Sequence, residues 1–234
     1  MTSRLDLDRA HVLAHRRRVG SLDERLPAGA DSLRIAAWAG LQDSVPRAAV
    51  LSIHARVAET TPHAWEDPSL AQLWGPRFAA YVVAERDLAV FGLGRLPLDA
   101  PAVRRAEDLA ERLAMFLDGR RLPYGEAGRA LGVDPNALRY AAATGTVRIR
   151  WDGARQPTIW TVAPPEIGAS AARVELARRH LHVFGPSTVA GFGRWAGVRS
   201  PTARDAFERL RPALLPARRN IARRALRLTE EIGE

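Results

Sequence analysis

The 234-residue sequence predicts a mainly α-helical protein with small β-hairpins, in the α+β class. The first observation is a recurring pattern of a leading helix, a short helix, a glycine and a second helix, which appears up to three times at irregular spacing. The second is that short alternating stretches bounded by glycine and proline accompany two of these repeats, as is typical of hairpins. We therefore expect tandem winged helix-turn-helix modules at residues 1–95, 102–163 and 168–234.

In the first module we expect another helix-turn-helix closed by a hairpin. The expected helices cover 5–19, 30–41, 47–57, 67–73 and 85–91, with paired strands inside 73–83 around Gly75 and Pro76. A stretch rich in glycine and proline, 92–101, is the expected linker.

The second module carries the clearest pattern. A leading helix at 102–117 is followed by a short helix at 124–131, which Gly132 ends because glycine adopts the left-handed conformation without a clash. Asp134 can cap the next helix, which begins at Pro135 and runs to about Thr144. Alternating apolar and basic residues at 146–151, a turn at 152–153 and a return at 157–162 predict a hairpin.

The third module is expected to hold helices at 170–184, 187–195 and 201–210, with Ser187 as a cap. A basic helix follows Leu210, with arginines on one side. No hairpin is visible there, so the third wing is expected to be missing. The basic helix is either a phosphate-tracking tail or an ordinary solvated helix.

In a winged helix-turn-helix the second helix enters the major groove and the wing touches phosphates. The candidate DNA-binding residues are accordingly Arg77, Asn136, Arg139, Arg148, Arg150 and Arg155. Arg148 and Arg150 alternate with apolar residues and should share one strand face. The alternatives are that a basic strand face is simply solvated, and that such modules bind protein or nothing.

Composition favours a polyanionic partner, which we take to be double-stranded DNA. The formal net charge is +9, and all 35 basic residues are arginines, which fork onto phosphates and guanine edges. The arginine and alanine content also fits the bias of a GC-rich bacterial genome. With no lysine, amine-dependent lyase chemistry has no side chain to use, so any base excision should be hydrolytic.

Composition also sets negative expectations. The absence of cysteine excludes disulfides and thiolate metal sites, and no apolar run reaches membrane length. His11 and His15 are spaced as a metal pair, but arginines surround them and no carboxylate motif accompanies them. We expect no metal, no cofactor and no membrane association, a cytoplasmic, nucleoid-associated location, and a monomer, with oligomeric state otherwise undetermined.

Two stretches carry a family resemblance. The segments LARRHLHVFGPSTVAGFGRWAGV, residues 176–198, and WAGLQDSVPRAAVLSIHARV, residues 38–57, resemble the AlkZ/YcaQ-like winged-helix DNA glycosylases. The resemblance spans nearly the whole chain. It implies tandem winged-helix modules around a positively charged concave face, and excision of alkylated or crosslinked purines.

The resemblance also implies a catalytic motif, which consists of two glutamines flanking an aliphatic residue, or a glutamine and an aspartate in that spacing. Gln42 matches the first position, but Asp43 in the middle and Ser44 in the second position depart from the motif. Asp43 could supply a carboxylate if the loop is shifted by one residue, because the cationic sugar formed on hydrolysis needs an oxygen beside it. Equally, Asp43 and Ser44 could cap the helix that follows.

Three functions therefore remain open. The first is a DNA-binding glycosylase whose candidate catalytic residues are Gln42, Asp43 and Ser44. The second is a winged-helix DNA-binding regulator or degenerate paralogue without catalysis, which the serine at position 44 favours. The third is a protein-interaction scaffold, which the basic strand face opposes.

Overall fold

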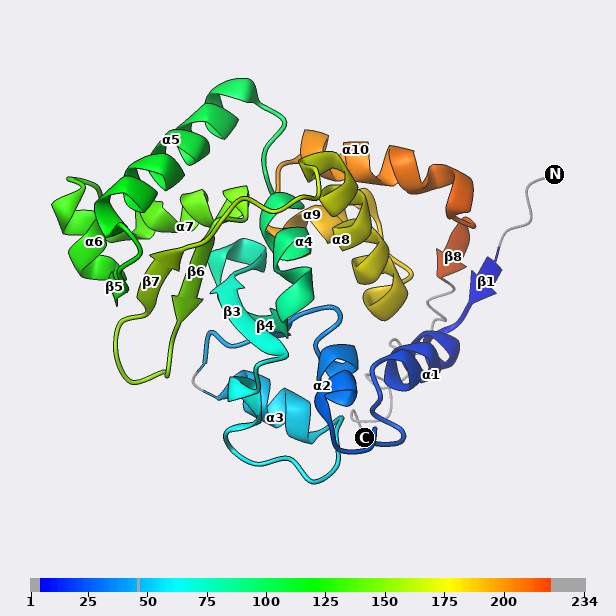
Figure 1. The fold of residues 1–234 in the computed structure, drawn as a ribbon. Helices are drawn as coiled ribbons and strands as arrows, with labels where there is room; N and C mark the ends of the chain where they lie inside the picture. The colour runs from blue at the N-terminus through cyan, green and yellow to red at the C-terminus, as the bar shows by residue number, and fades with distance from the viewer. Residues whose placement is uncertain (1–4, 46, 220–234) are drawn as a thin grey trace, which may run out of the picture.

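The computed structural model describes residues 5–45 and 47–219, with side chains described up to Ala217 (Figure 1). The α-helices are α1 (Arg9–Val19), α2 (Ala30–Ala36), α3 (Ala48–His54), α4 (Leu88–Leu93), α5 (Ala100–Leu117), α6 (Tyr124–Ala130), α7 (Leu138–Ala141), α8 (Ala169–Phe184), α9 (Val189–Ala196) and α10 (Ser200–Leu210). The strands are β1 (Leu5–Leu7), β2 (Leu41–Gln42), β3 (Leu70–Trp74), β4 (Ala80–Ala84), β5 (Leu122–Pro123), β6 (Val147–Arg150), β7 (Thr158–Thr161) and β8 (Ala217–Arg219). The expected combination of helices with small hairpins is confirmed.

The two expected hairpins join into a single antiparallel sheet. Its strand order is β2-β4-β3-β6-β7-β5, so β3 of the first hairpin pairs with β6 of the second, where Gln72 lies opposite Ile149. The sequence had indicated two separate hairpins. Strands β1 and β8 form a second, parallel pair that brings Leu5 beside Ala217 (Figure 1).

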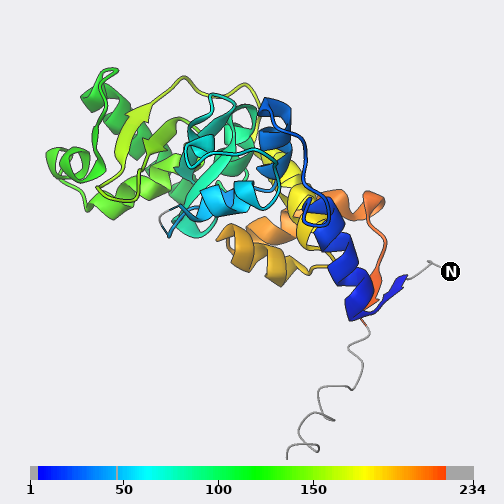
Figure 2. The same cartoon turned by 90° about the horizontal axis from the view of Figure 1, so that it is seen from below.

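Helices from different parts of the chain bury this sheet in three clusters. Helices α5 and α7 cover β6 and β7, where Leu113, Leu138 and Ile149 are fully buried. Helices α4, α8, α9 and α10 pack together over β3 and β4 around Phe91 and Phe192 (Figures 1 and 2). Helices α2 and α3 cover the β2 end of the sheet. The sheet is therefore the common support of all three cores.

The helix-turn-helix and hairpin at 124–161 follow the sequence pattern closely. Gly132 and Gly145 have φ values of +68° and +80° at the ends of their helices. The Asp134 side chain accepts a hydrogen bond from the Asn136 N–H at 2.7 Å, as a cap should. The second helix starts as a 3₁₀ turn at 135–137 and continues as α7. The wider division of the chain into three winged-helix modules stays a prediction.

Several sequence expectations were wrong in detail. Residues 5–7 form strand β1 rather than the first turn of a helix, and α2 ends at Ala36 so that Leu41 belongs to strand β2. The helix expected at 67–73 is absent from the described residues, because β3 begins at Leu70. Pairing on both edges of this central, buried strand outweighs its local preference. The cap of α9 is Thr188 rather than Ser187. The basic helix expected after Leu210 lies mostly outside the described residues, and where the structure describes it, residues 217–219 form strand β8 instead.

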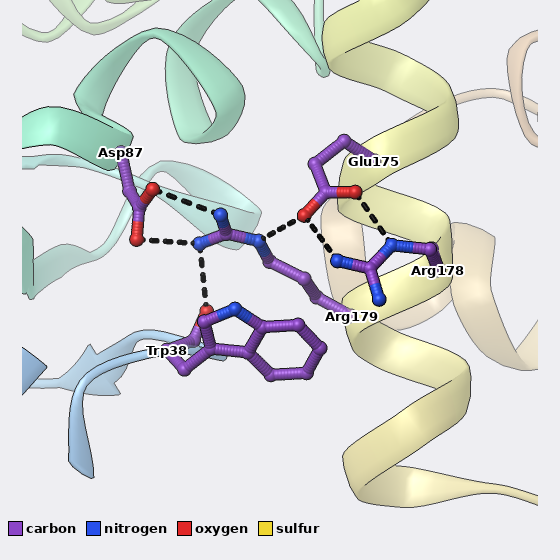
Figure 3. Close-up of polar contacts among 5 residues, drawn as sticks. All are labelled: Trp38, Asp87, Glu175, Arg178 and Arg179. Atoms are coloured by element: carbon purple, nitrogen blue, oxygen red, sulfur yellow. Dashed lines mark hydrogen bonds and ion pairs between the residues drawn. The ribbon is translucent and has the colours of Figure 1, made fainter. Parts of the chain in front are cut away.

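A buried arginine of α8 forms ion pairs and hydrogen bonds with residues from other parts of the chain (Figure 3). Arg179 pairs with both carboxylate oxygens of Asp87, at 2.8 and 2.7 Å, and with Glu175 at 2.7 Å. It also donates to the backbone oxygen of Trp38 at 3.0 Å, while the Trp38 ring lies beside its guanidinium. The side chains of Arg179 and Asp87 are 7% and 9% exposed, so neither charge has water to replace its partner.

Replacing this arginine with an uncharged side chain of similar length should strongly destabilise the fold. We expect Arg179→Met to lower the free energy of unfolding by about 3–5 kcal/mol, because it leaves the Asp87 carboxylate buried and unpaired. The matched variant Arg178→Met, whose exposed side chain also pairs with Glu175, should cost less than about 1 kcal/mol. Urea denaturation of the three proteins measures this, and equal losses from the two variants would contradict it.

Candidate nucleic-acid and catalytic site

The chain leaves edge strand β2 at Gln42, whose backbone pairs with Tyr81 of β4. Alternation along this stretch exposes Gln42 and Ser44 and buries Asp43. The Gln42 Nε2 donates to the Ser44 hydroxyl at 2.6 Å, and its Oε1 accepts from Arg77 at 2.6 Å. These contacts hold one amide in a fixed orientation at the protein surface.

Asp43 has a structural position in this loop. One carboxylate oxygen accepts from the Ala49 N–H at 3.0 Å, so it caps the start of α3, and the other accepts from Gln72 at 3.0 Å. Burial raises the pKa of Asp43, while these hydrogen bonds and the charge of Arg47 act in the opposite direction. The carboxylate therefore faces the interior, and no one-residue shift of the loop brings it to the face that carries Gln42.

Gln72 connects this loop to the second hairpin. Its Oε1 accepts from the Trp151 N–H at 2.7 Å, and its Nε2 donates to the Trp151 carbonyl at 3.1 Å as well as to Asp43. Only 4% of Gln72 is exposed. The side chain continues the pairing between β3 and β6 where the backbone ladder ends, and so fixes the distance between the Gln42 loop and the hairpin.

Arg77 and Phe78 form the β3–β4 turn in a conformation that non-glycine residues seldom adopt, with φ of +56° and +58°. The Phe78 ring lies edge to face with Tyr140 of α7, at a centroid distance of 4.8 Å. On the other side, a Cβ on Gly197 would come within 2.7 Å of the Arg77 nitrogen, so the turn between α9 and α10 abuts the same residues. Packing from two directions thus holds the turn that presents Arg77 to Gln42.

The candidate DNA-binding residues do not form one free basic cluster. Arg148 is half-buried, donates to the Gly145 carbonyl at 2.9 Å, and has its pKa lowered by burial. Arg150 pairs with Glu66 at 3.0 Å and lies over the Trp65 ring. The pair therefore makes intramolecular contacts instead of the free basic face expected of the strand.

The other four candidates differ in exposure. Arg139 lies near the Trp74 ring, and its Nε is buried with no partner among the described residues. Asn136, at the start of the second helix of the helix-turn-helix, and Arg155, in the β6–β7 turn, are exposed. Together with Arg77, these exposed residues are the ones free to meet a ligand.

The sequence did not single out Gln72, Phe78, Arg95 or Tyr140. Gln72 lies in a segment expected to be helical, and Arg95 lies in the expected linker, so no local pattern marked either. In the described part of the chain no cluster of three metal-ligating side chains occurs. No helix in that part is long and apolar enough to cross a membrane.

Comparisons with known proteins agree with the resemblance. The sequence matches the model of a family described as "DNA glycosylase AlkZ-like" over residues 35–232. The structure is similar to the Streptomyces sahachiroi DNA glycosylase AlkZ, with a TM-score of 0.68 and 19% sequence identity. That match covers 88% of this chain and 66% of the AlkZ chain, so it concerns the fold and spans less than two thirds of that protein. No curated protein matched the sequence.

The buried loop contacts predict that Asp43 matters for stability and Ser44 does not. Asp43→Ala leaves the Ala49 N–H unpaired and removes a partner of Gln72, and should lower the free energy of unfolding by about 1–3 kcal/mol. Ser44→Ala, at the next position, whose side chain is exposed, should change it by less than about 0.5 kcal/mol. If urea denaturation finds Asp43→Ala as stable as the wild type, the cost of burying the Asp43 carboxylate outweighs both of its hydrogen bonds. Asp43 would then not be what holds the Gln42 loop in place.

Proposed function

Because this chain belongs to the AlkZ-like family of DNA glycosylases, we propose that it binds double-stranded DNA and hydrolyses the N-glycosidic bond of an alkylated or crosslinked purine. The observation that carries the proposal is the exposed Gln42 amide held between Arg77 and Ser44. An amide in a fixed orientation can accept a hydrogen bond from an attacking water and place its dipole beside a cationic sugar.

The chemistry does not require an exposed carboxylate beside Gln42. A purine alkylated at a ring nitrogen carries a positive charge and leaves as a neutral base, so its departure requires no acid. As the bond between C1′ and that base breaks, the water oxygen forms the new bond to C1′ and its proton passes to solvent. Gln42 orients the water through its second Oε1 lone pair, and the Ser44 hydroxyl supplies a further polar contact.

For DNA contact we propose that α6, α7 and the β6–β7 hairpin act as a winged helix-turn-helix. Asn136 lies where such a helix meets the bases, and Arg155 lies at the tip of the wing. Both are exposed, as is Arg77 beside the Gln42 amide. Arg139, Arg148 and Arg150 then support this surface through their contacts with Trp74, Gly145 and Glu66. The net charge of +9 favours a duplex over an uncharged partner.

A second candidate function is DNA binding without catalysis, as in a regulator or a degenerate paralogue. The observation that favours it is Ser44, whose hydroxyl stands where the family motif implied by the resemblance has a second amide or carboxylate. A hydroxyl already bonded to Gln42 is a weaker group for polarising water than a carboxylate. The two candidates share the DNA interface and differ only in base release.

Release of 7-methylguanine from a methylated duplex separates these candidates. With enzyme in excess, we expect the wild type to release the base and Gln42→Ala to do so about a hundredfold more slowly, because the water loses its orienting acceptor. Glu24→Ala removes an exposed side chain between α1 and α2, outside the proposed interface, and serves as the control, with an unchanged single-turnover rate.

Duplex affinity is measured on the same proteins by fluorescence anisotropy. We expect Gln42→Ala to bind as the wild type does. No release by the wild type despite tight binding would leave the non-catalytic candidate, and an undiminished rate in Gln42→Ala would remove Gln42 from the chemistry.

A further inference from the structure

A cavity of about 710 Å³ is lined by residues of α5, α7, the β3–β4 turn and the turn between α9 and α10, and Gln42 is not among them. Its walls are mostly apolar and include Phe78, Leu109, Val133, Tyr140 and Val198. This volume lies within the range of small-molecule and cofactor sites. Tyr140 is 58% exposed although its ring packs against Phe78, so an aromatic surface is open for a ligand.

The inner wall of this cavity contains a buried charge that lacks a counter-charge. Arg95 is 4% exposed, and one of its terminal nitrogens donates to the carbonyls of Trp74, at 2.6 Å, and Gly75. Its Nε and Nη2 have no hydrogen-bond partner among the described residues, and no described carboxylate pairs with it. Burial lowers the pKa of Arg95 to about 10, which leaves it charged at neutral pH.

A buried cation with unused donors is costly unless something binds it. The guanidinium lies over the Phe78 ring at 4.7 Å, so its neighbourhood suits a flat group that carries acceptors on its edge. The other charges of the lining also favour an anion. The described lining residues include three further arginines, Arg105, Arg112 and Arg199, and one carboxylate, Asp108. Arg105 and Arg199 are exposed and make no ion pair with a described residue.

We propose that this cavity binds a single unpaired nucleotide. The base stacks on Tyr140 beside Phe78, Arg95 donates to the acceptor edge of the base, and the phosphate lies at the rim near Arg105 and Arg199. The proposal rests on the proposed function, because a DNA strand that passes Gln42 and Arg77 reaches the cavity at the next residue, Phe78. The nucleotide comes either from such a strand or from free solution.

Fluorescence of 2-aminopurine in three probes tests the proposal. The probes are a duplex with one bulged 2-aminopurine, the same duplex fully paired, and free 2-aminopurine deoxyribonucleoside monophosphate. We expect the wild type to bind the bulged duplex about tenfold more tightly than the paired one and to quench the bulged base by stacking. Binding of the free monophosphate with quenching identifies solution nucleotide as a source, and its absence restricts the source to a strand.

Variants assign the effect to the cavity. Tyr140→Ala and Arg105→Met should each remove most of the preference for the bulge, and Arg95→Met should do so if it folds. Arg104→Met, the neighbouring exposed arginine that does not line the cavity, should keep it, as should Gln42→Ala. The proposal is overturned if the wild type binds bulged and paired duplexes equally and ignores the monophosphate, or if Tyr140→Ala and Arg105→Met keep the preference. If the wild type prefers the bulged duplex but releases no base, the result counts against the proposed function and leaves the nucleotide site in place.

Discussion

The buried amide of Gln72 spans the junction between two hairpins, bonding both backbone groups of Trp151, 79 residues further along the chain, and the carboxylate of Asp43. Its position follows from the pairing of β3 with β6, which puts Gln72 opposite Ile149 in the middle of the sheet. A buried amide must satisfy its donors and acceptor, so this side chain allows little change in the spacing of the three segments. The geometry of the Gln42 loop depends on that constraint.

The contacts of Gln72 and the packing of the β3–β4 turn together determine which side chains are exposed beside Gln42. Asp43, held by Gln72 and by the start of α3, faces inward, and strand alternation then turns Gln42 and Ser44 outward. The strained β3–β4 turn, fixed by Tyr140 and the α9–α10 turn, brings Arg77 to the same amide. The turn also places Phe78 in the wall of the cavity that contains Arg95. One sheet thus positions both the candidate catalytic face and the candidate nucleotide site.

Local signals predicted much of the fold. The glycines at 132 and 145, the Asp134 cap and the alternation at 147–151 identified the helix-turn-helix and its hairpin, because each depends on neighbouring residues only. The joining of the two hairpins was not predictable in this way, since it depends on a contact between Gln72 and Ile149. The same limit explains the helix wrongly expected at 67–73, whose residues form a strand because both of its edges find partners.

In the candidate site, too, the sequence predicted what depends on neighbouring residues and missed what depends on distant contacts. Gln42 was identified by its motif, and the capping role considered for Asp43 is what the structure has. Arg148 and Arg150 do not form the free basic face that was expected. Glu66 and Trp65, which are distant in sequence, contact the Arg150 guanidinium, and the nearby Gly145 carbonyl accepts a hydrogen bond from Arg148. Charge alternation predicts which strand face a residue lies on, but not what the rest of the chain places over that face.

In the proposed complex the Gln42 loop, the β3–β4 turn and the β6–β7 turn face one duplex together. Amide hydrogen exchange with and without a paired duplex tests it most directly. We expect bound DNA to slow exchange at residues 42–45, 75–79 and 152–156 at once, and high salt to abolish all three effects together. Protection confined to one of these segments, or found only on helices α1 and α2, would contradict it.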